Sequence, residues 1–196
     1  MLYERRRIFN DISLRIGMTF SEFGLTPNQW TLLSLVFAVI TAWFLSVSLF
    51  PLAALFLFFA GFLDFVDGSV ARYTGMISRR GAYVDTIMDR YVEGVIAFGL
   101  IFSKLPGFYL PANAWVFLYF FGSIMTTYAK AAAKEKDLFI EEMSGGILER
   151  AERLSLLFIG VLLAGIYPIF LTYILVILAI LSNITALQRI KKALGY

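Results

Sequence analysis

The chain has 196 residues, of which 60% are hydrophobic and 17% aromatic; its mean hydropathy is +0.79 and its formal net charge is +3. A soluble domain contains about 45–50% apolar residues, so this composition excludes an ordinary water-soluble domain and predicts an all-α integral membrane protein. Cysteine and histidine are absent, which excludes disulfides, Cys/His zinc sites and histidine acid–base chemistry and leaves carboxylates as ligands for hard ions such as Mg²⁺ or Mn²⁺.

The first predicted element is an amphipathic helix within residues 1–22. Apolar residues recur there at helical spacing among charged ones, at Ile8, Phe9, Ile12, Ile16 and Phe20. This pattern is typical of a helix that lies in the membrane interface, and a frayed tail is the alternative. Thr26 and Pro27 follow as a predicted N-cap and first residue of the next helix.

Six membrane-spanning helices are predicted after this segment, because each needs about 20 mostly apolar residues. They cover residues 31–50, 51–71, 81–103, 112–133, 147–166 and 167–186. The tightest connections, at residues 50–51 and 167–168, are predicted to be hairpin turns between antiparallel helices. We expect one domain over residues 1–196, with the six-helix bundle at 27–192.

The basic residues predict the orientation of this bundle. Six spans place both termini on one side of the membrane, and 16 of the 17 lysines and arginines fall on that side, with only Lys104 on the other. Because basic residues are enriched in cytoplasmic loops, we expect both termini, and any site beside them, at the cytoplasmic face of a multi-pass protein of the cell membrane.

Four aspartates stand within 26 residues at the connection between the second and third spans, namely Asp64, Asp67, Asp85 and Asp89. Spacings of three and four put each pair on one helix face, and the short loop between the helices predicts that the two faces converge. Divalent cations or bound protons would relieve the resulting repulsion. Charged residues within spans are functional candidates, and a cytoplasmic salt network with neighbouring arginines is the alternative.

Small residues accompany these carboxylates. Gly68, Ala71 and Gly81 lie on the same helix faces, which leaves room for a ligand against the backbone. Tight helix–helix packing through small residues is the other explanation, and both can hold together.

The complete pattern is Asp64-x-x-Asp67-Gly68-x-x-Ala71-Arg72 followed by Gly81-x-x-x-Asp85-x-x-x-Asp89. It resembles the signature of the CDP-alcohol phosphotransferases and contains all eight of its residues. The resemblance implies an enzyme of phospholipid biosynthesis that displaces CMP from a CDP-linked lipid with an alcohol, using two Mg²⁺ or Mn²⁺ ions, and it implies a homodimer.

The same resemblance implies roles for individual residues. Asp64, Asp67 and Asp85 would be metal ligands, and Asp89 would be the general base and also touch one metal. The residues that would bind the CDP-lipid are Gly68, Ala71, Arg72, Ser78 and Gly81, together with Pro27, Asn28 and Thr31. The last three also fit a plain helix start.

The acceptor alcohol is predicted from a basic cluster. Lys130 ends the fourth span, and Arg150 and Arg153 share a face at the start of the fifth. They could converge beside the aspartates and bind a phosphate on the acceptor, although membrane anchoring would equally explain Lys130. The surrounding segments resemble those of phosphatidylinositol phosphate and archaetidylinositol phosphate synthases, which implies inositol 1-phosphate as the acceptor.

Three other functions stay open on the sequence. Glycerol 3-phosphate is an alternative acceptor, because it also carries a phosphate. A divalent-cation transporter could use the same carboxylates, but nothing charged continues the path across the outer half of the bundle and no broken helices are evident. A non-catalytic scaffold would tolerate replacing the aspartates with asparagine.

Overall fold

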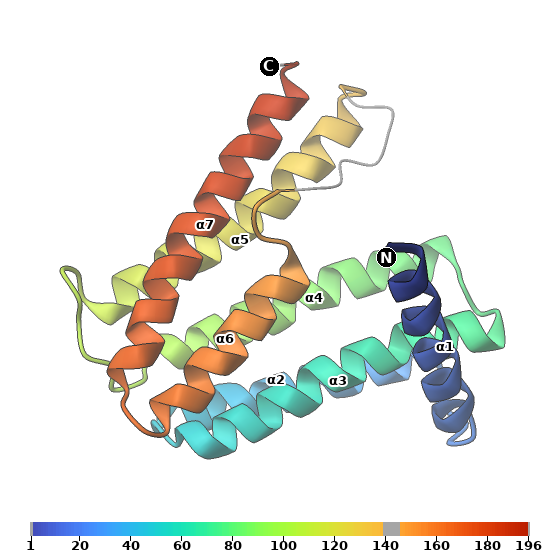
Figure 1. Ribbon diagram of the computed structural model, residues 1–196, viewed down its shortest axis with the longest axis horizontal. Helices are drawn as coiled ribbons and strands as arrows, with labels where there is room; N and C mark the ends of the chain where they lie inside the picture. The colour runs from blue at the N-terminus through green and yellow to red at the C-terminus, as the bar shows by residue number, and fades with distance from the viewer. Residues whose placement is uncertain (1, 139–145, 196) are drawn as a thin grey trace. The chain divides into compact units, whose positions relative to one another are not determined.

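The computed structural model describes residues 2–138 and 146–195, with only the backbone of 2–9. The side chains of Ile8 and Phe9, two members of the predicted apolar stripe, therefore lie outside the described residues. The described residues form α-helices joined by short connections (Figure 1). The helices are α1 (Leu2–Ser21), α2 (Pro27–Ser46), α3 (Phe50–Thr74), α4 (Arg79–Ile101), α5 (Ala112–Glu135), α6 (Arg150–Ala164) and α7 (Ile169–Ala193).

The predicted helices are found in the predicted order, with ends displaced by up to seven residues, at the end of α7. α2 begins at Pro27, which lacks an N–H and has a preset φ that suits the first helical position. Residues 47–49 and 165–168 form the two tight connections that the sequence predicts. Three of the described helices, α2, α3 and α7, are long and apolar enough to cross a membrane. α4 differs from these three helices because its first half carries charged residues, and α6 differs because it has only 15 residues.

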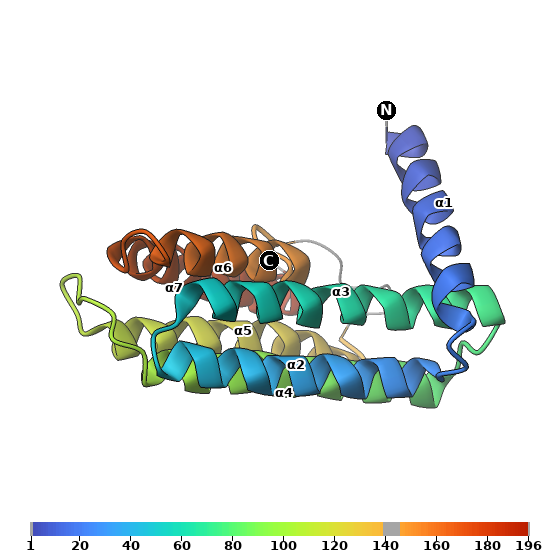
Figure 2. The same cartoon turned by 90° about the horizontal axis from the view of Figure 1, so that it is seen from below.

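The described chain divides into two compact units, and the first comprises Met1–Thr41 with Leu55–Val95. Its core is formed by Trp30, Leu63, Val66 and Val70. Ile16 and Phe20 of α1 pack against this core, whereas Ile12 is exposed. The predicted stripe of α1 is therefore divided between a protein-facing side and an open side. Figure 2 shows α1 crossing the end of α3 at a steep angle.

Polar contacts connect α2 and α3 inside this first unit. The Ser34 hydroxyl, which is buried, donates to the Ala60 carbonyl oxygen at 2.8 Å. One helical turn earlier, the Thr31 hydroxyl reaches across to Asp67. These contacts set the register of the helix that carries the first two aspartates.

The second unit comprises Ala42–Ala54 with Ile96–Tyr196. Within it, α5 and α7 lie side by side (Figure 1) and approach closely, because Gly122 packs directly against Asn183. The Asn183 side-chain amide donates to the carbonyl oxygens of Leu118 at 2.9 Å and Ala179 at 2.8 Å. Small residues and side-chain hydrogen bonds are how helices associate in lipid, where apolar burial gives little driving force.

Candidate active site

The acidic faces of α3 and α4 meet within the first unit. Asp64, Asp67 and Asp85 each offer a carboxylate oxygen, and these oxygens all lie within 4.8 Å of one another. The loop between the helices is short and turns at Gly75, whose φ of 70° favours glycine. Residues 18 positions apart in the sequence are thus brought into one cluster, as the helix-face argument predicts.

The donor set of this cluster fits divalent cations. Oxygens bound to one Mg²⁺ at about 2.0–2.1 Å can be at most about 4.2 Å apart, and a pair of ions separated by about 3.5–4 Å spans a wider set. Three carboxylates within 4.8 Å therefore need only small side-chain movements to hold one or two ions. The cluster consists of carboxylate oxygens alone, which suits Mg²⁺ or Mn²⁺ rather than soft metals.

Thr31, one of the predicted CDP-lipid contacts, bonds to one of the clustered aspartates. Its hydroxyl oxygen lies 2.7 Å from Asp67 Oδ2, to which it donates, and both residues are buried, at 4% and 5% exposure. A hydrogen bond to a metal-binding carboxylate fixes the direction in which its oxygens point. The structure therefore makes Thr31 a residue that orients Asp67.

Asp89 bonds to a neighbouring arginine. It lies one helical turn after Asp85, is 8% exposed, and accepts a hydrogen bond from Arg90 Nη2 at 3.3 Å. This ion pair matches one contact of the alternative salt network. Asp89 is not among the three carboxylates that come within 4.8 Å of one another, so the structure brings together three of the four predicted aspartates in this way.

Arg72 donates to hydroxyl groups instead of to the aspartates. Its Nε and Nη2 atoms lie 3.1 and 2.8 Å from the Ser13 Oγ atom of α1. A methyl group on Gly68 would lie 3.3 Å from Arg72 Nη1, so the missing side chain leaves room for the guanidinium. Ala71, the other small residue of this helix face, is half-buried beside Arg72 in the chain.

The beginnings of α2 and α4 contribute the remaining predicted nucleotide contacts. The Ser78 hydroxyl accepts a hydrogen bond from the Gly81 N–H at 3.0 Å and so caps α4. A methyl group on Gly81 would lie 3.1 Å from Ser78 Oγ and 3.8 Å from Asn28 Oδ1. Asn28, Ser78 and Gly81 therefore gather at one place, next to Pro27 at the first position of α2.

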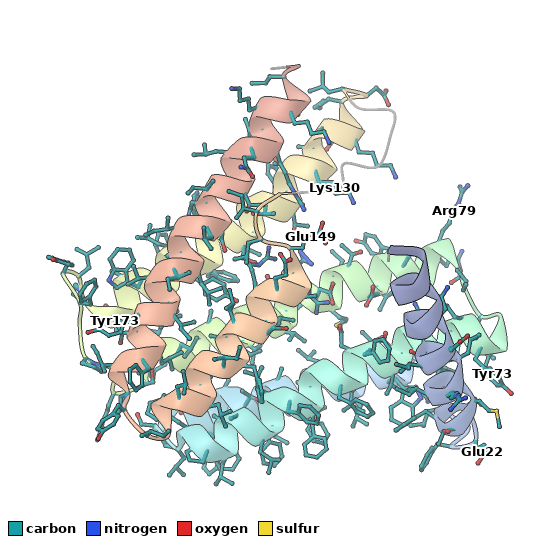
Figure 3. All side chains as sticks on the ribbon, viewed as in Figure 1. Glu22, Tyr73, Arg79, Lys130, Glu149 and Tyr173 are labelled. Atoms are coloured by element: carbon teal, nitrogen blue, oxygen red, sulfur yellow. The ribbon has the colours of Figure 1, made fainter. Side chains whose placement is uncertain are left out.

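The predicted acceptor residues belong to the second unit. Lys130 lies on α5 (Figure 3) and is half-buried, and Arg150 is the first residue of α6. Arg153 is 2% exposed and donates from Nη1 to the Leu148 carbonyl oxygen at 3.3 Å. A guanidinium this deeply buried is not a membrane-surface anchor. The convergence of these cations with the aspartates stays a prediction.

Two glutamates next to these arginines have a structural role. The Glu149 N–H donates to Glu152 Oε2 at 2.8 Å, and the two residues form a capping box at the start of α6. Figure 3 shows Glu149 at this helix end. Glu149 and Glu152 therefore account for the negative charge beside Arg150 and Arg153, because they cap the first turn of α6.

Sequence reasoning missed the contribution of α1 to the site. Ser13 is 2% exposed and contacts both Ser69 and Arg72, and Gly17 lies against the Ser69 carbonyl group. The signal was present, because Ser13 and Gly17 are four residues apart and form a small-residue face on a helix. The charged and apolar residues of the same helix obscure it.

Comparison with known proteins agrees with this geometry. The family model for CDP-alcohol phosphatidyltransferase matches residues 24–187. The chain is 32% identical over 189 residues to the archaetidylinositol phosphate synthase of Pyrococcus horikoshii, an alignment that covers 91% of this chain and 89% of that protein.

The chain is also similar in fold to solved structures of a phosphatidylinositol phosphate synthase. A crystal structure of the Mycobacterium tuberculosis phosphatidylinositol phosphate synthase with CDP-DAG bound matches with a TM-score of 0.80 and 26% identity, covering 93% of this chain and 94% of that one. A second structure of that protein, in complex with manganese and citrate, matches with a TM-score of 0.81 and 26% identity over 93% and 88%. The family match includes the clustered aspartates and most of the described helices, and the chain is a member of the CDP-alcohol phosphatidyltransferase family of transferases.

Proposed function

We propose that this enzyme transfers the lipid phosphoryl unit of a CDP-lipid, CDP-diacylglycerol or CDP-archaeol, to inositol 1-phosphate and releases CMP, as a step in phospholipid biosynthesis. The observation that carries the proposal is the cluster of Asp64, Asp67 and Asp85 within the family signature. Inositol phosphate as the acceptor is supported by the names of the relatives, which are archaetidylinositol phosphate and phosphatidylinositol phosphate synthases.

The reaction exchanges one phosphorus–oxygen bond for another. The acceptor hydroxyl oxygen attacks the phosphorus that carries the lipid, the bond from this phosphorus to the CMP oxygen breaks, and CMP leaves with the bonding electrons. The three clustered carboxylates, with Asp89 beside one of the ions, would hold two Mg²⁺ or Mn²⁺ ions. When bound, these ions would offset the charge of the diphosphate and of the departing CMP.

Asp89 is the residue we assign to the acceptor proton. It follows the clustered Asp85 by one turn on α4, so its carboxylate faces the same side of the helix. Its burial and its ion pair with Arg90 hold the carboxylate in one orientation. A base must be held within hydrogen-bonding reach of the proton it removes, and this position is consistent with that requirement.

The CDP-lipid is expected to bind at the first unit. Gly68, Ala71 and Arg72 on α3, with Ser78 and Gly81 at the start of α4, form the proposed nucleotide side, joined by Pro27 and Asn28 at the start of α2. Thr31 acts through Asp67. Arg72 is exposed and its guanidinium lies over Gly68, a position that suits an anionic diphosphate.

Lys130, Arg150 and Arg153 are proposed to bind the acceptor phosphate. The burial of Arg153 supports this, because a membrane-surface anchor keeps its charged end in water, whereas only 2% of Arg153 is exposed. Glycerol 3-phosphate would satisfy the same cations, so the acceptor must be tested directly.

We further propose the membrane arrangement that the sequence predicts. It comprises six spans, an interfacial α1, a single domain over residues 1–196, cytoplasmic termini and active site, and a homodimer. The exposed apolar residues of α1, which include Ile12 at 48% and Met18 at 53%, support contact of this helix with lipid. Cysteine-accessibility labelling from each side of the membrane and crosslinking in the bilayer test the topology and the dimer.

The deciding experiment is an acceptor panel. Purified protein in detergent with Mg²⁺ or Mn²⁺ receives each CDP-lipid and one of inositol 1-phosphate, glycerol 3-phosphate, serine or free inositol, and CMP release is measured. We expect release with inositol 1-phosphate and little with acceptors that lack a phosphate. Preference for glycerol 3-phosphate would overturn the acceptor assignment. Absence of CMP release, together with Mn²⁺ uptake by proteoliposomes, would establish a transporter instead.

A further inference from the structure

The N-terminal helix contacts the signature helix through small residues. At Gly17 of α1 a methyl group would overlap the Ser69 carbonyl oxygen and lie 2.8 Å from Tyr73 Cβ. Ser13, one turn earlier on the same face, is 2% exposed, and Ser69 is fully buried. Tyr73 appears beside α1 in Figure 3. Backbone and side chains of α1 and α3 therefore meet with little space for any larger residue.

The two serines form a directed chain of hydrogen bonds to Arg72. Ser69 Oγ lies 2.8 Å from the Phe65 carbonyl oxygen, which accepts its proton, and Ser13 Oγ lies 3.0 Å from Ser69 Oγ. Because the Ser69 hydroxyl donates its only proton to Phe65, the hydrogen bond between the two serines must run from the Ser13 hydroxyl to Ser69 Oγ. Both lone pairs of Ser13 then remain for the Arg72 Nε–H at 3.1 Å and an Nη2–H at 2.8 Å.

The hydrogen bonds from Arg72 to Ser13 determine which N–H groups of the guanidinium can still bind a ligand. Guanidinium carries five N–H groups, and Ser13 takes the Nε edge. The guanidinium lies over Gly68, with Nη1 as its nearest atom, 3.3 Å from where a methyl group on Gly68 would be. Arg72 is exposed as a residue, and its hydrogen bonds to the described residues use Nε and Nη2, which leaves Nη1 for an anionic ligand that arrives from solvent.

We propose that Ser13 is a positioning residue for CDP-lipid binding, and that α1 holds Arg72 so that its Nη1 edge is presented to the diphosphate over Gly68. The inference rests on the proposed function, since it assigns the diphosphate to Arg72. An arginine loses much rotamer freedom when it is ordered by a ligand. Ser13 orders it beforehand, which removes part of that loss from the binding step.

The test is a double-mutant cycle of Ser13→Ala and Arg72→Ala, read as the KM for CDP-lipid in the CMP-release assay. Ser13→Ala should raise this KM about three- to tenfold, the range for ordering one long side chain on binding, while kcat and the KM for inositol 1-phosphate stay near wild type. In the Arg72→Ala background Ser13→Ala should have no further effect. Ser21→Ala is the control, because among the described residues the Ser21 hydroxyl bonds only within α1, to the Met18 carbonyl oxygen at 2.7 Å.

Each result distinguishes the possibilities. A wild-type enzyme without CMP release refutes the proposed function itself. Active wild type with an unchanged KM in Ser13→Ala, or an equal KM increase in the presence and absence of Arg72, refutes the positioning role and leaves the function intact. If Ser13→Ala does not fold, Ser69→Ala removes both the acceptor of the Ser13 hydroxyl and a direct contact of Arg72 Nη2 at 3.4 Å. An unchanged KM in that variant refutes the role of this hydrogen-bond chain in its turn.

Discussion

Replacing Thr31 with valine should weaken metal binding without removing any carboxylate. The substitution keeps the shape of the side chain but deletes the hydroxyl that donates to Asp67 Oδ2 at 2.7 Å. Both groups are almost fully buried, so water does not replace the lost donor. A hydrogen bond to a charged group contributes about 1.5–3 kcal/mol, and about 1.4 kcal/mol corresponds to a tenfold change in affinity.

We therefore expect the apparent dissociation constant for Mn²⁺ to rise roughly 10- to 100-fold, the range seen when partners of metal ligands are removed. The measurement is CMP release as a function of Mn²⁺ concentration, with free Mn²⁺ followed by electron paramagnetic resonance. At saturating Mn²⁺ the KM for CDP-lipid should return close to wild type, because Thr31 acts through Asp67.

Two variants control this experiment. Thr31→Ser retains the hydroxyl and should titrate with Mn²⁺ like wild type. Thr41→Val removes another buried hydroxyl from α2, one that bonds only to the Phe37 carbonyl oxygen at 2.9 Å, and should leave the Mn²⁺ dependence unchanged. An unchanged titration in Thr31→Val, or an equal shift in Thr41→Val, would refute the reasoning.

Four further outcomes are expected. Asp89→Asn should bind CDP-lipid nearly as wild type while turnover falls by about 10²- to 10⁴-fold, the usual contribution of a general base; normal turnover would exclude that role. Arg153→Ala should raise the KM for inositol 1-phosphate at least on the order of tenfold, and an equal rise in the KM for CDP-lipid would contradict the acceptor assignment. Gly68→Ala should displace the Arg72 guanidinium, whose Nη1 atom would be 3.3 Å from the new methyl group, and raise the KM for CDP-lipid with the metal titration unaffected. Removal of divalent cations with EDTA should abolish CMP release and Mn²⁺ should restore it, whereas activity that persists in EDTA would argue against the carboxylate cluster as a metal site.

Local patterns in the sequence predict the helices and much of the site. Long apolar runs and the prolines at 27, 51 and 168 mark where α2, α3 and α7 begin, to within a few residues. Spacings of three and four place aspartates on one face of each helix, and a short loop brings Asp64, Asp67 and Asp85 together. Backbone geometry over one or two helical turns is enough for these conclusions.

Contacts between distant segments were not predictable in the same way. Thr31 and Asp67 are 36 positions apart, and the sequence gives no sign of which helix face Thr31 turns toward α3. The Ser13–Arg72 contact spans 59 positions and depends on the docking of α1. Such features depend on how helices pack, which periodicity does not specify.

The amide bridge of Asn183 restricts how α5 and α7 can move. A single NH₂ group serves carbonyl oxygens on both helices, and Gly122 lets the two backbones come close enough for this to happen. In hydrocarbon no water can take over a donor that loses its partner. Sliding of one helix along the other by less than a full turn of about 5.4 Å would break the hydrogen bond to Leu118, so we expect α5 and α7 to keep this register during catalysis.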